Sequence, residues 1–121
     1  MSSITKEQLK LRTKQLALRI IKVFAALPHR TEAQVLGRQL LRSGTSVGAQ
    51  YREATRARSL AEFVSKLESA QQELEETSYW LELLTECGLL PEKRLLPLAK
   101  EVNEVQAIFA AAAKNAKSPK R

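Results

Sequence analysis

The feature that most constrains the fold is an unbroken alternation of three- and four-residue steps between mostly apolar residues at positions 60 to 84. An α-helix has 3.6 residues per turn, so this spacing places all of these side chains on one helical face. Ser59 and Glu62 have the form of a capping box, and Gly88 is a natural C-terminal stop. The segment therefore predicts one long amphipathic helix. The residues in the series are Leu60, Phe63, Leu67, Ala70, Leu74, Thr77, Leu81 and Leu84.

Three other segments have the same periodicity. Thr5 with Gln8, and Thr31 with Gln34, repeat the capping-box pattern at the start of the first and second segments. Pro91 is suited to open the last segment. We therefore expect one domain at 1–113, with helices at about 5–27, 31–57, 60–87 and 91–113, and a basic disordered tail at 114–121.

These segments together predict an all-α protein. Spacing near 3.5 residues implies near-parallel helices with knobs-into-holes packing, and short connections make sequential helices antiparallel. The composition agrees, because apolar residues make up 44% of the chain, aromatic residues only 5%, and every acidic residue is Glu. We expect an up-down-up-down antiparallel four-helix bundle.

Residues 36–56 sort into three sectors on a helical wheel, which favours a helix over a loop. Gly37, Gly44 and Gly48 form a stripe without side chains beside an apolar sector. Each interior glycine costs about 1 kcal/mol relative to alanine, so the stripe needs a compensating gain. We favour close packing against a neighbouring helix. The alternative is a local kink at positions 44–46, where Thr and Ser bond back to carbonyls.

Basic residues occupy the opposite sector of that wheel. The arginines from Arg38 to Arg56 would form a stripe about 27 Å long, which could follow a phosphate backbone. The net charge is +7, with +5 on residues 1–28, +4 on 29–58 and −6 on 59–88. The acidic third helix could instead neutralise the basic helices, within the bundle or across a subunit boundary. The candidate nucleic-acid-binding residues are Arg38, Arg42, Arg52, Arg56, Arg58, Lys14 and Lys22.

The first helix has a second apolar face opposite its core seam. Leu11 and Leu18 are seven residues apart on that face, and Ile21 flanks them, which predicts an oligomer interface. Trp80 could extend this contact or pack laterally within the bundle. Glu53 lies among arginines and is expected to form a structural ion pair with Arg56 or with a neighbouring subunit.

Nothing in the sequence points to catalysis. His29 and Cys87 are the single residues of their kinds and cannot build a metal site of the His/Cys type. We expect no catalytic residues, no metal, no cofactor and no small-molecule substrate, and Cys87 is expected to be a small packing residue. No apolar run is long enough to span a membrane, and the N-terminus is too polar for a signal peptide, so a cytoplasmic protein is expected.

The runs QLLRSGTSVGAQYREATRARSLAEFVSKL and EETSYWLELLTECGLL closely resemble the bacterial four helix bundle protein family. That family is related to proteins encoded in intervening sequences of 23S rRNA genes and to accessory proteins of diversity-generating retroelements. The resemblance spans roughly residues 15 to 112. The chain departs from the family pattern at Gln50, where the family usually has Asn, and at Ala54, where many relatives have Gly. Glu53 matches the glutamate of the family.

The resemblance implies a ring-like homopentamer with a basic surface for nucleic acid. The retroelement branch binds a reverse transcriptase and RNA. Two functions therefore remain open. One is a non-enzymatic oligomeric accessory protein that binds RNA or DNA with low sequence selectivity. The other is a structural adaptor that binds another protein, such as a reverse transcriptase, and uses its charge for subunit assembly.

Overall fold

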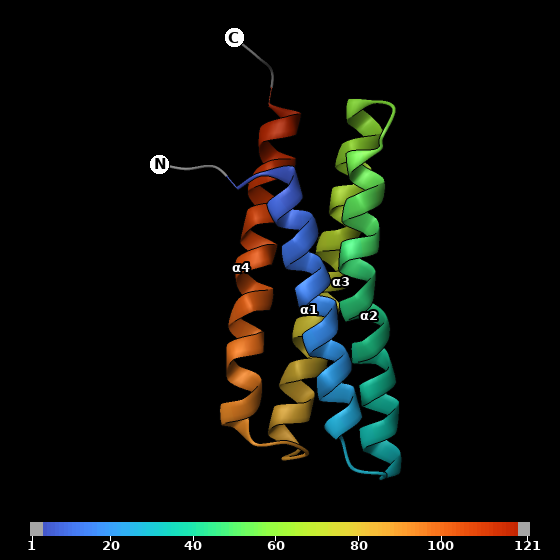
Figure 1. Ribbon diagram of the computed structural model, residues 1–121, viewed down its shortest axis with the longest axis vertical. Coiled ribbons are helices and arrows are strands. Elements are labelled where there is room, and N and C mark those ends of the chain that lie inside the picture. Colours follow the sequence, from blue (N-terminus) through green and yellow to red (C-terminus); the bar gives the residue numbers. More distant parts are fainter. Residues whose placement is uncertain (1–3, 119–121) are drawn as a thin grey trace.

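The computed structural model describes residues 4–118, which form four helices. These are α1 (Lys6–Ala26), α2 (Thr31–Thr55), α3 (Leu60–Glu86) and α4 (Glu92–Lys117). Consecutive helices run antiparallel, so the α1–α2 and α3–α4 loops lie at one end of the bundle and the α2–α3 loop at the other (Figure 1). The described part of the chain contains no strand, and the predicted up-down-up-down four-helix bundle is confirmed.

The starts of the first and third helices follow their capping signals. The Thr5 hydroxyl accepts a hydrogen bond from the Gln8 N–H at 3.0 Å, and the Thr5 N–H donates to Gln8 Oε1 at 2.7 Å. This is a complete capping box, as predicted. The Ser59 hydroxyl accepts from the Glu62 N–H at 3.1 Å, but Glu62 Oε1 accepts from the Arg58 N–H instead of the Ser59 N–H. The third helix therefore has only half of the predicted box.

The predicted capping box of the second helix is wrong. Thr31 is already the first helical residue, and Arg30 is an N-cap without a side-chain hydrogen bond. Gln34 Nε2 donates to the Pro28 carbonyl at 3.0 Å, so this side chain fixes the α1–α2 loop rather than the helix end.

The third helix ends where it was predicted to end, whereas the fourth helix is longer than predicted. Gly88 has φ +68° and ends α3, with Leu89 N–H donating to the Leu84 carbonyl at 3.2 Å, as expected of a glycine C-cap. The fourth helix continues to Lys117, so the prediction of a disordered tail from residue 114 is wrong. The alanine run at 110–113 has high helix propensity, and Lys114 and Lys117 complement the dipole at the helix end. The rest of the predicted tail, residues 119–121, lies outside the described residues.

The glycine stripe of α2 packs closely against α1. A Cβ atom at Gly44 would lie 2.7 Å from Ile20 Cγ1, and one at Gly37 would lie 2.6 Å from Leu27 Cδ1. At Gly48 the nearest atom would be Thr13 Oγ1, at 3.2 Å. The three missing side chains therefore allow the two backbones to approach, and close packing is confirmed. The hydroxyls of Thr45 and Ser46 also bond back to carbonyls, within a helix that continues unbroken to Thr55.

The core lies along the whole bundle axis and is almost entirely aliphatic. Its largest fully buried members are Phe109, Leu16, Ile20, Leu40, Leu67, Leu74, Leu81, Leu84, Leu95, Val47, Val102 and Val105. Leu60, the first residue of the predicted third-helix seam, is exposed because it opens α3 beyond the core. Thr77 and Ser43 are buried polar residues that satisfy each other across α2 and α3 through a 2.8 Å hydrogen bond.

Candidate nucleic-acid interface

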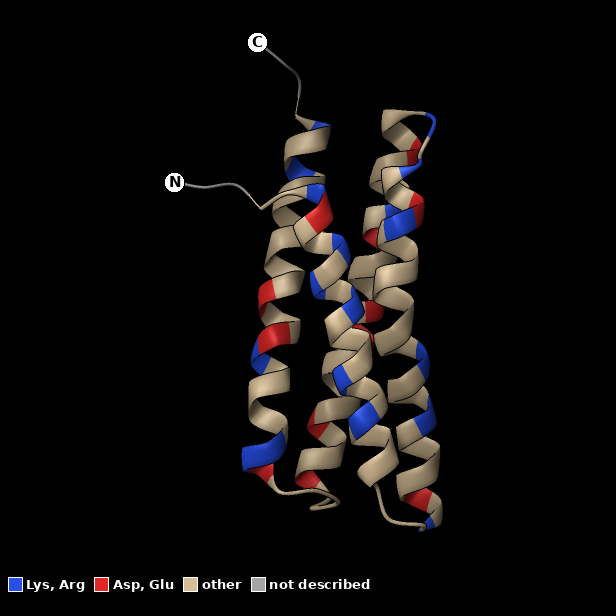
Figure 2. Ribbon diagram, viewed as in Figure 1, with Lys and Arg blue, Asp and Glu red and all other residues tan. Residues whose placement is uncertain are grey.

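The arginines of α2 project away from the core, as the helical wheel predicts. Ala33, Leu40 and Val47 are buried on the opposite side of the helix, whereas Arg38 and Arg52 are exposed. Basic residues outnumber acidic ones on α1 and α2, which lie side by side (Figure 2). Within residues 4–118, four of the five arginines predicted to bind nucleic acid are exposed and form no ion pair. They are Arg38, Arg52, Arg56 and Arg58.

Arg42 does not belong to this set of free arginines. Its guanidinium reaches across to α3, where Nη1 lies 3.2 Å from Glu73 Oε1 and Nη2 bonds to Glu76. The hydrogen bond to Glu76 and the charge of Glu73 hold the pKa of Arg42 above its ordinary value. The predicted continuous stripe is therefore interrupted in the middle of α2, because an acidic turn of α3 lies beside Arg42. Arg38 lies on one side of the gap, and Arg52, Arg56 and Arg58 lie on the other.

Glu53 forms an ion pair, as predicted, but with a different partner. Its Oε1 atom lies 2.7 Å from the Nζ atom of Lys66 on α3, so the expected pair with Arg56 is wrong. The hydrogen bond that the Lys66 ammonium donates to the Glu53 carboxylate raises the pKa of Lys66. Because Lys66 engages this carboxylate, Arg52 and Arg56 stay available near the α2–α3 loop. These two residues and Arg58 form a basic cluster at that end of the bundle, which we call the arginine cluster.

Lys14 and Lys22 lie apart from the arginine cluster. They are exposed on the outer side of α1, among the residues predicted for an oligomer interface. Leu11, Leu18 and Ile21 are exposed there too. One surface of α1 therefore combines lysines with exposed aliphatic side chains, and the predicted nucleic-acid contacts lie on two separate faces.

Trp80 fits lateral packing within the bundle better than a place on an outer surface. It is half-buried and packs against the core, and its indole N–H is buried without a hydrogen-bond partner in the described part of the chain. Tyr79, which is tilted against it with ring centroids 5.1 Å apart, is the exposed aromatic residue of this pair. Gln50, the departure from the family pattern, likewise has a buried side-chain oxygen that no described donor reaches.

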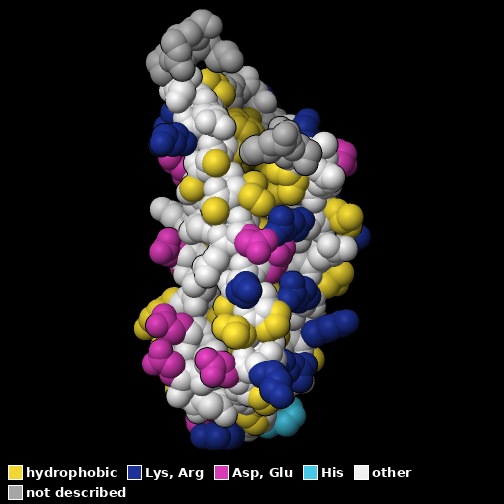
Figure 3. Space-filling view, turned by 90° about the vertical axis from the view of Figure 1, so that its left-hand side faces the viewer, with side chains coloured by type: hydrophobic (Ala, Val, Ile, Leu, Met, Phe, Trp, Pro, Cys, Tyr) yellow, Lys and Arg dark blue, Asp and Glu magenta, His cyan; other side chains and the backbone are white. Residues whose placement is uncertain are grey.

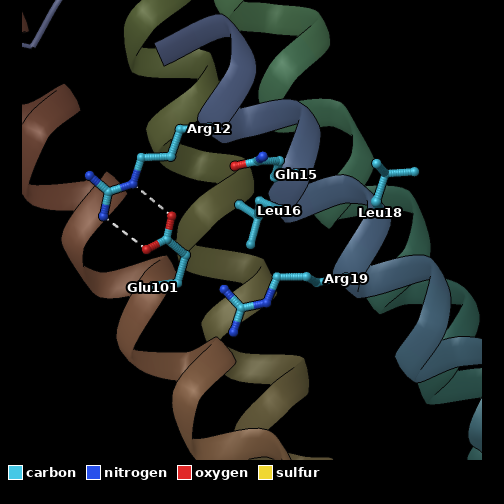
Figure 4. A pocket seen from close by; sticks show the side chains of 6 residues that line it. All are labelled: Arg12, Gln15, Leu16, Leu18, Arg19 and Glu101. Carbon is cyan, nitrogen blue, oxygen red and sulfur yellow. Dashed lines mark hydrogen bonds and ion pairs between the residues drawn. The ribbon is translucent and has the colours of Figure 1, made fainter. Parts of the chain in front are cut away.

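A groove of about 610 Å³ lies between α1 and α4, the two neighbouring helices that pack least closely (Figure 4). Arg12 closes part of it through a bidentate pair with Glu101, with Nε–Oε2 at 2.7 Å and Nη2–Oε1 at 2.8 Å. The Glu104 carboxylate also lies 2.6 Å from Arg12 Nη2. Arg19 extends into the groove below this pair and has no carboxylate partner in residues 4–118. Polar bonds from one arginine thus join α1 to α4, where apolar packing is sparse.

Arg12 and Arg42 provide a matched test of ion-pair strength, because each bridges two glutamates. The side chain of Arg12 is 27% exposed and that of Arg42 is 50% exposed. Replacing Arg12 with Met leaves the partly buried Glu101 unpaired, and we expect the free energy of unfolding to fall by about 1–2 kcal/mol. Replacing Arg42 with Met should cost less than about 1 kcal/mol, because its half-exposed guanidinium is screened by solvent and reaches the partly buried Glu73 through a single 3.2 Å contact instead of a bidentate pair. Urea denaturation of both variants measures the difference, and equal losses would contradict the burial argument.

The remaining candidate residues form no site. In residues 4–118, no group of His, Cys, Asp and Glu side chains is arranged to hold a metal ion. Cys87 is exposed at the end of α3, so the expected packing role is wrong. None of the described helices has the length and apolarity needed to cross a membrane.

The fold and its basic surface can be compared with known proteins. The family model described as 23S rRNA-intervening sequence protein matches residues 6–111, which is most of the chain. The chain belongs to the 23S rRNA-intervening sequence protein family. The predicted resemblance is therefore confirmed.

A solved structure is also similar to this chain. It is a protein of unknown function from the S23 ribosomal protein family of Bacteroides thetaiotaomicron VPI-5482, and it is 33% identical to this chain. The match covers 90% of this chain and 97% of that one, with a TM-score of 0.84. A comparison of the present chain with curated proteins found no match.

Sequence reasoning missed the ion pairs that decide which arginines are free. Arg12 and Glu101 are 89 residues apart, and Arg42 and Glu76 are 34 apart. A signal was present, because Glu101 and Glu104 lie one helical turn apart, as do Glu73 and Glu76. Each pair of glutamates can hold one guanidinium if the facing helix has an arginine at the same height along the bundle. The sequence alone does not give the relative heights of residues on two different helices.

Proposed function

We propose that the protein is a non-enzymatic oligomer that binds RNA or DNA through the arginine cluster, with Arg38 as a further contact. The observation that supports this is the pairing pattern of the arginines. Arg12 and Arg42 are neutralised by glutamates, whereas Arg38 and the arginine cluster are exposed and have no acidic partner in the described residues. Unpaired guanidinium groups keep their donors free for phosphate oxygens, which they bind in bidentate geometry.

The chemistry of the cluster favours backbone contacts over base recognition. No aromatic residue lies between Arg52 and Arg58, so the cluster offers no ring on which a base can stack. Binding should therefore depend on phosphate charge, be weakly selective for sequence and fall steeply with salt. Assembly into a ring would repeat the cluster once per subunit and raise the apparent affinity through avidity.

The decisive experiment is a salt series with the triple variant R52E/R56E/R58E. Loss of about three phosphate contacts should reduce the slope of log K against log salt by about 3, and lower affinity about 100-fold or more at 0.1 M salt. Fluorescence anisotropy with mixed-sequence single-stranded RNA and double-stranded DNA measures both quantities. Binding that is insensitive to salt, or unchanged in the variant, would overturn the proposal.

A matched control separates the cluster from net charge. The variant K93E/R94E/K100E has the same change of six charge units, but its residues are exposed on α4, towards the opposite end of the bundle. It should bind with nearly the affinity of the wild type once both are compared at the same oligomeric state. Equal losses in both triple variants would show that only overall charge matters.

The second candidate is a structural adaptor for another protein. It is supported by the pairs that Arg42 and Lys66 form with glutamates, because they show basic groups of one helix used to hold another. In that case the wild type should show no binding to either nucleic acid even at low salt. The same anisotropy series therefore separates the two functions.

A further inference from the structure

A second groove lies between α3 and α4, close to the loop that joins them. It has a volume of about 350 Å³ and an apolar floor that includes Leu81 and Leu95. Leu96 at its side is among the most exposed large aliphatic residues of the protein. Three carboxylates line it, and none forms an ion pair within residues 4–118. They belong to Glu82, Glu86 and Glu92. We call this surface the acidic groove.

The outer surface of α1 has the complementary properties. Leu18 and Ile21 are exposed, and Arg19 and Lys22 beside them have no acidic partner among the described side chains. A helix that presents aliphatic residues flanked by cations fits an apolar groove rimmed by carboxylates. In the single chain, both surfaces have apolar side chains exposed to water and charged groups without a partner among the described residues. Contact between the two surfaces would bury these apolar side chains and pair these charges.

The two surfaces also lie at matching heights. Leu18 to Lys22 are in the second half of α1, and the acidic groove spans the end of α3 and the start of α4. Both are thus in the half of the bundle that holds the α1–α2 and α3–α4 loops (Figure 1). Seen from the side of α4, the lower half of the molecule has basic side chains along the edge of α1, acidic ones along the opposite edge and hydrophobic groups between them (Figure 3). Two neighbouring copies can therefore pair these surfaces with parallel axes and little shift along them.

We propose that the acidic groove binds the Leu18–Lys22 surface of α1 from a second copy of the chain. This inference rests on the proposed assembly and names the two surfaces that form it. Because they are different surfaces, the contact is head-to-tail, and each copy keeps one free surface for the next. Such a contact closes into a ring or continues as a filament, and it leaves the arginine cluster uncovered at the opposite end of the bundle.

Charge-reversal variants test the pairing. R19E/K22E and E82K/E86K alter only exposed side chains. Each variant alone should lose self-association by about tenfold or more, because like charges face each other across the contact. An equimolar mixture should form mixed complexes that neither variant forms alone, because each variant supplies the reversed charges that the other lacks. Analytical ultracentrifugation over a concentration series measures all three samples.

The control is R52E/R56E/R58E, which changes the charge more but should assemble like the wild type. If the wild type assembles and either reversed variant assembles equally well, this inference is wrong while the proposed assembly stands. If the wild type is a monomer at all concentrations, both the inference and the proposed assembly are wrong. Failure of the mixture to form any mixed complex would also overturn the pairing, with circular dichroism used to confirm that both variants are folded.

Discussion

Replacing Gly44 with Leu is expected to lower the free energy of unfolding by about 3 kcal/mol or more. Even a single Cβ at this position would lie 2.7 Å from Ile20 Cγ1 and 3.0 Å from Ile20 Cγ2. These atoms are next to the Ile20 backbone, so no rotation of a flexible end relieves the clash. Ile20 is fully buried, and α1 would have to move away from α2 to make room. Guanidinium denaturation measures the loss.

The other glycines of the stripe provide the comparison for Gly44. Gly48→Ala should stay within about 1 kcal/mol of the wild type, because Thr13 Oγ1 at 3.2 Å needs to shift only slightly and alanine favours the helix. Gly44→Ala should lower the free energy of unfolding more than Gly48→Ala does. Ile20→Ala should cost less stability in the Gly44→Ala variant than in the wild type. If Gly44→Leu is as stable as the wild type, the close approach of α1 and α2 is wrong.

Phe109→Ala is expected to cost about 3–5 kcal/mol, the second large effect. Phe109 is the largest of the fully buried side chains, and its ring stacks on Tyr51 with centroids 5.2 Å apart and an interplanar angle of 22°. Truncation would leave a cavity between α2 and α4 that the long helices cannot collapse to fill. Thermal and urea unfolding followed by circular dichroism measure the loss.

A surface variant controls for the general effect of removing a large apolar side chain. Leu60 is exposed at the start of α3, so Leu60→Ala should change the stability by no more than about 0.5 kcal/mol. A loss below about 1 kcal/mol for Phe109→Ala would contradict the packing described for the centre of the bundle.

Most of the fold could be predicted because helix periodicity is a local property. The third-helix seam from Leu67 to Leu84 is buried as its spacing requires, and the close packing of Gly44 follows from a stripe visible on the wheel. The predictions that were wrong concern helix ends, where one local preference was outweighed by another interaction. Gln34 bonds to the loop rather than to a helix end, and the charged residues after 113 did not end a helix that its alanines favour.

The candidate site could be predicted only in outline. The outward direction of Arg38 and Arg52 follows from the wheel, since the core lies on the other side of α2. The sequence could not separate Arg42 from them, because its carboxylate partners belong to another helix and their height depends on how α2 and α3 pack. The partner of Glu53 was missed for the same reason.

The most direct test of the account is a side-chain NMR titration of the arginine Nε–Hε signals with single-stranded RNA. Arg52, Arg56 and Arg58 should shift at low salt and return when salt is added, because phosphates displace water from guanidinium groups that have no protein partner. The signals of Arg12 and Arg42 should not shift, because glutamates hold their guanidinium groups. Shifts confined to other arginines, or no shift at any RNA concentration, would contradict the claim that this cluster binds nucleic acid.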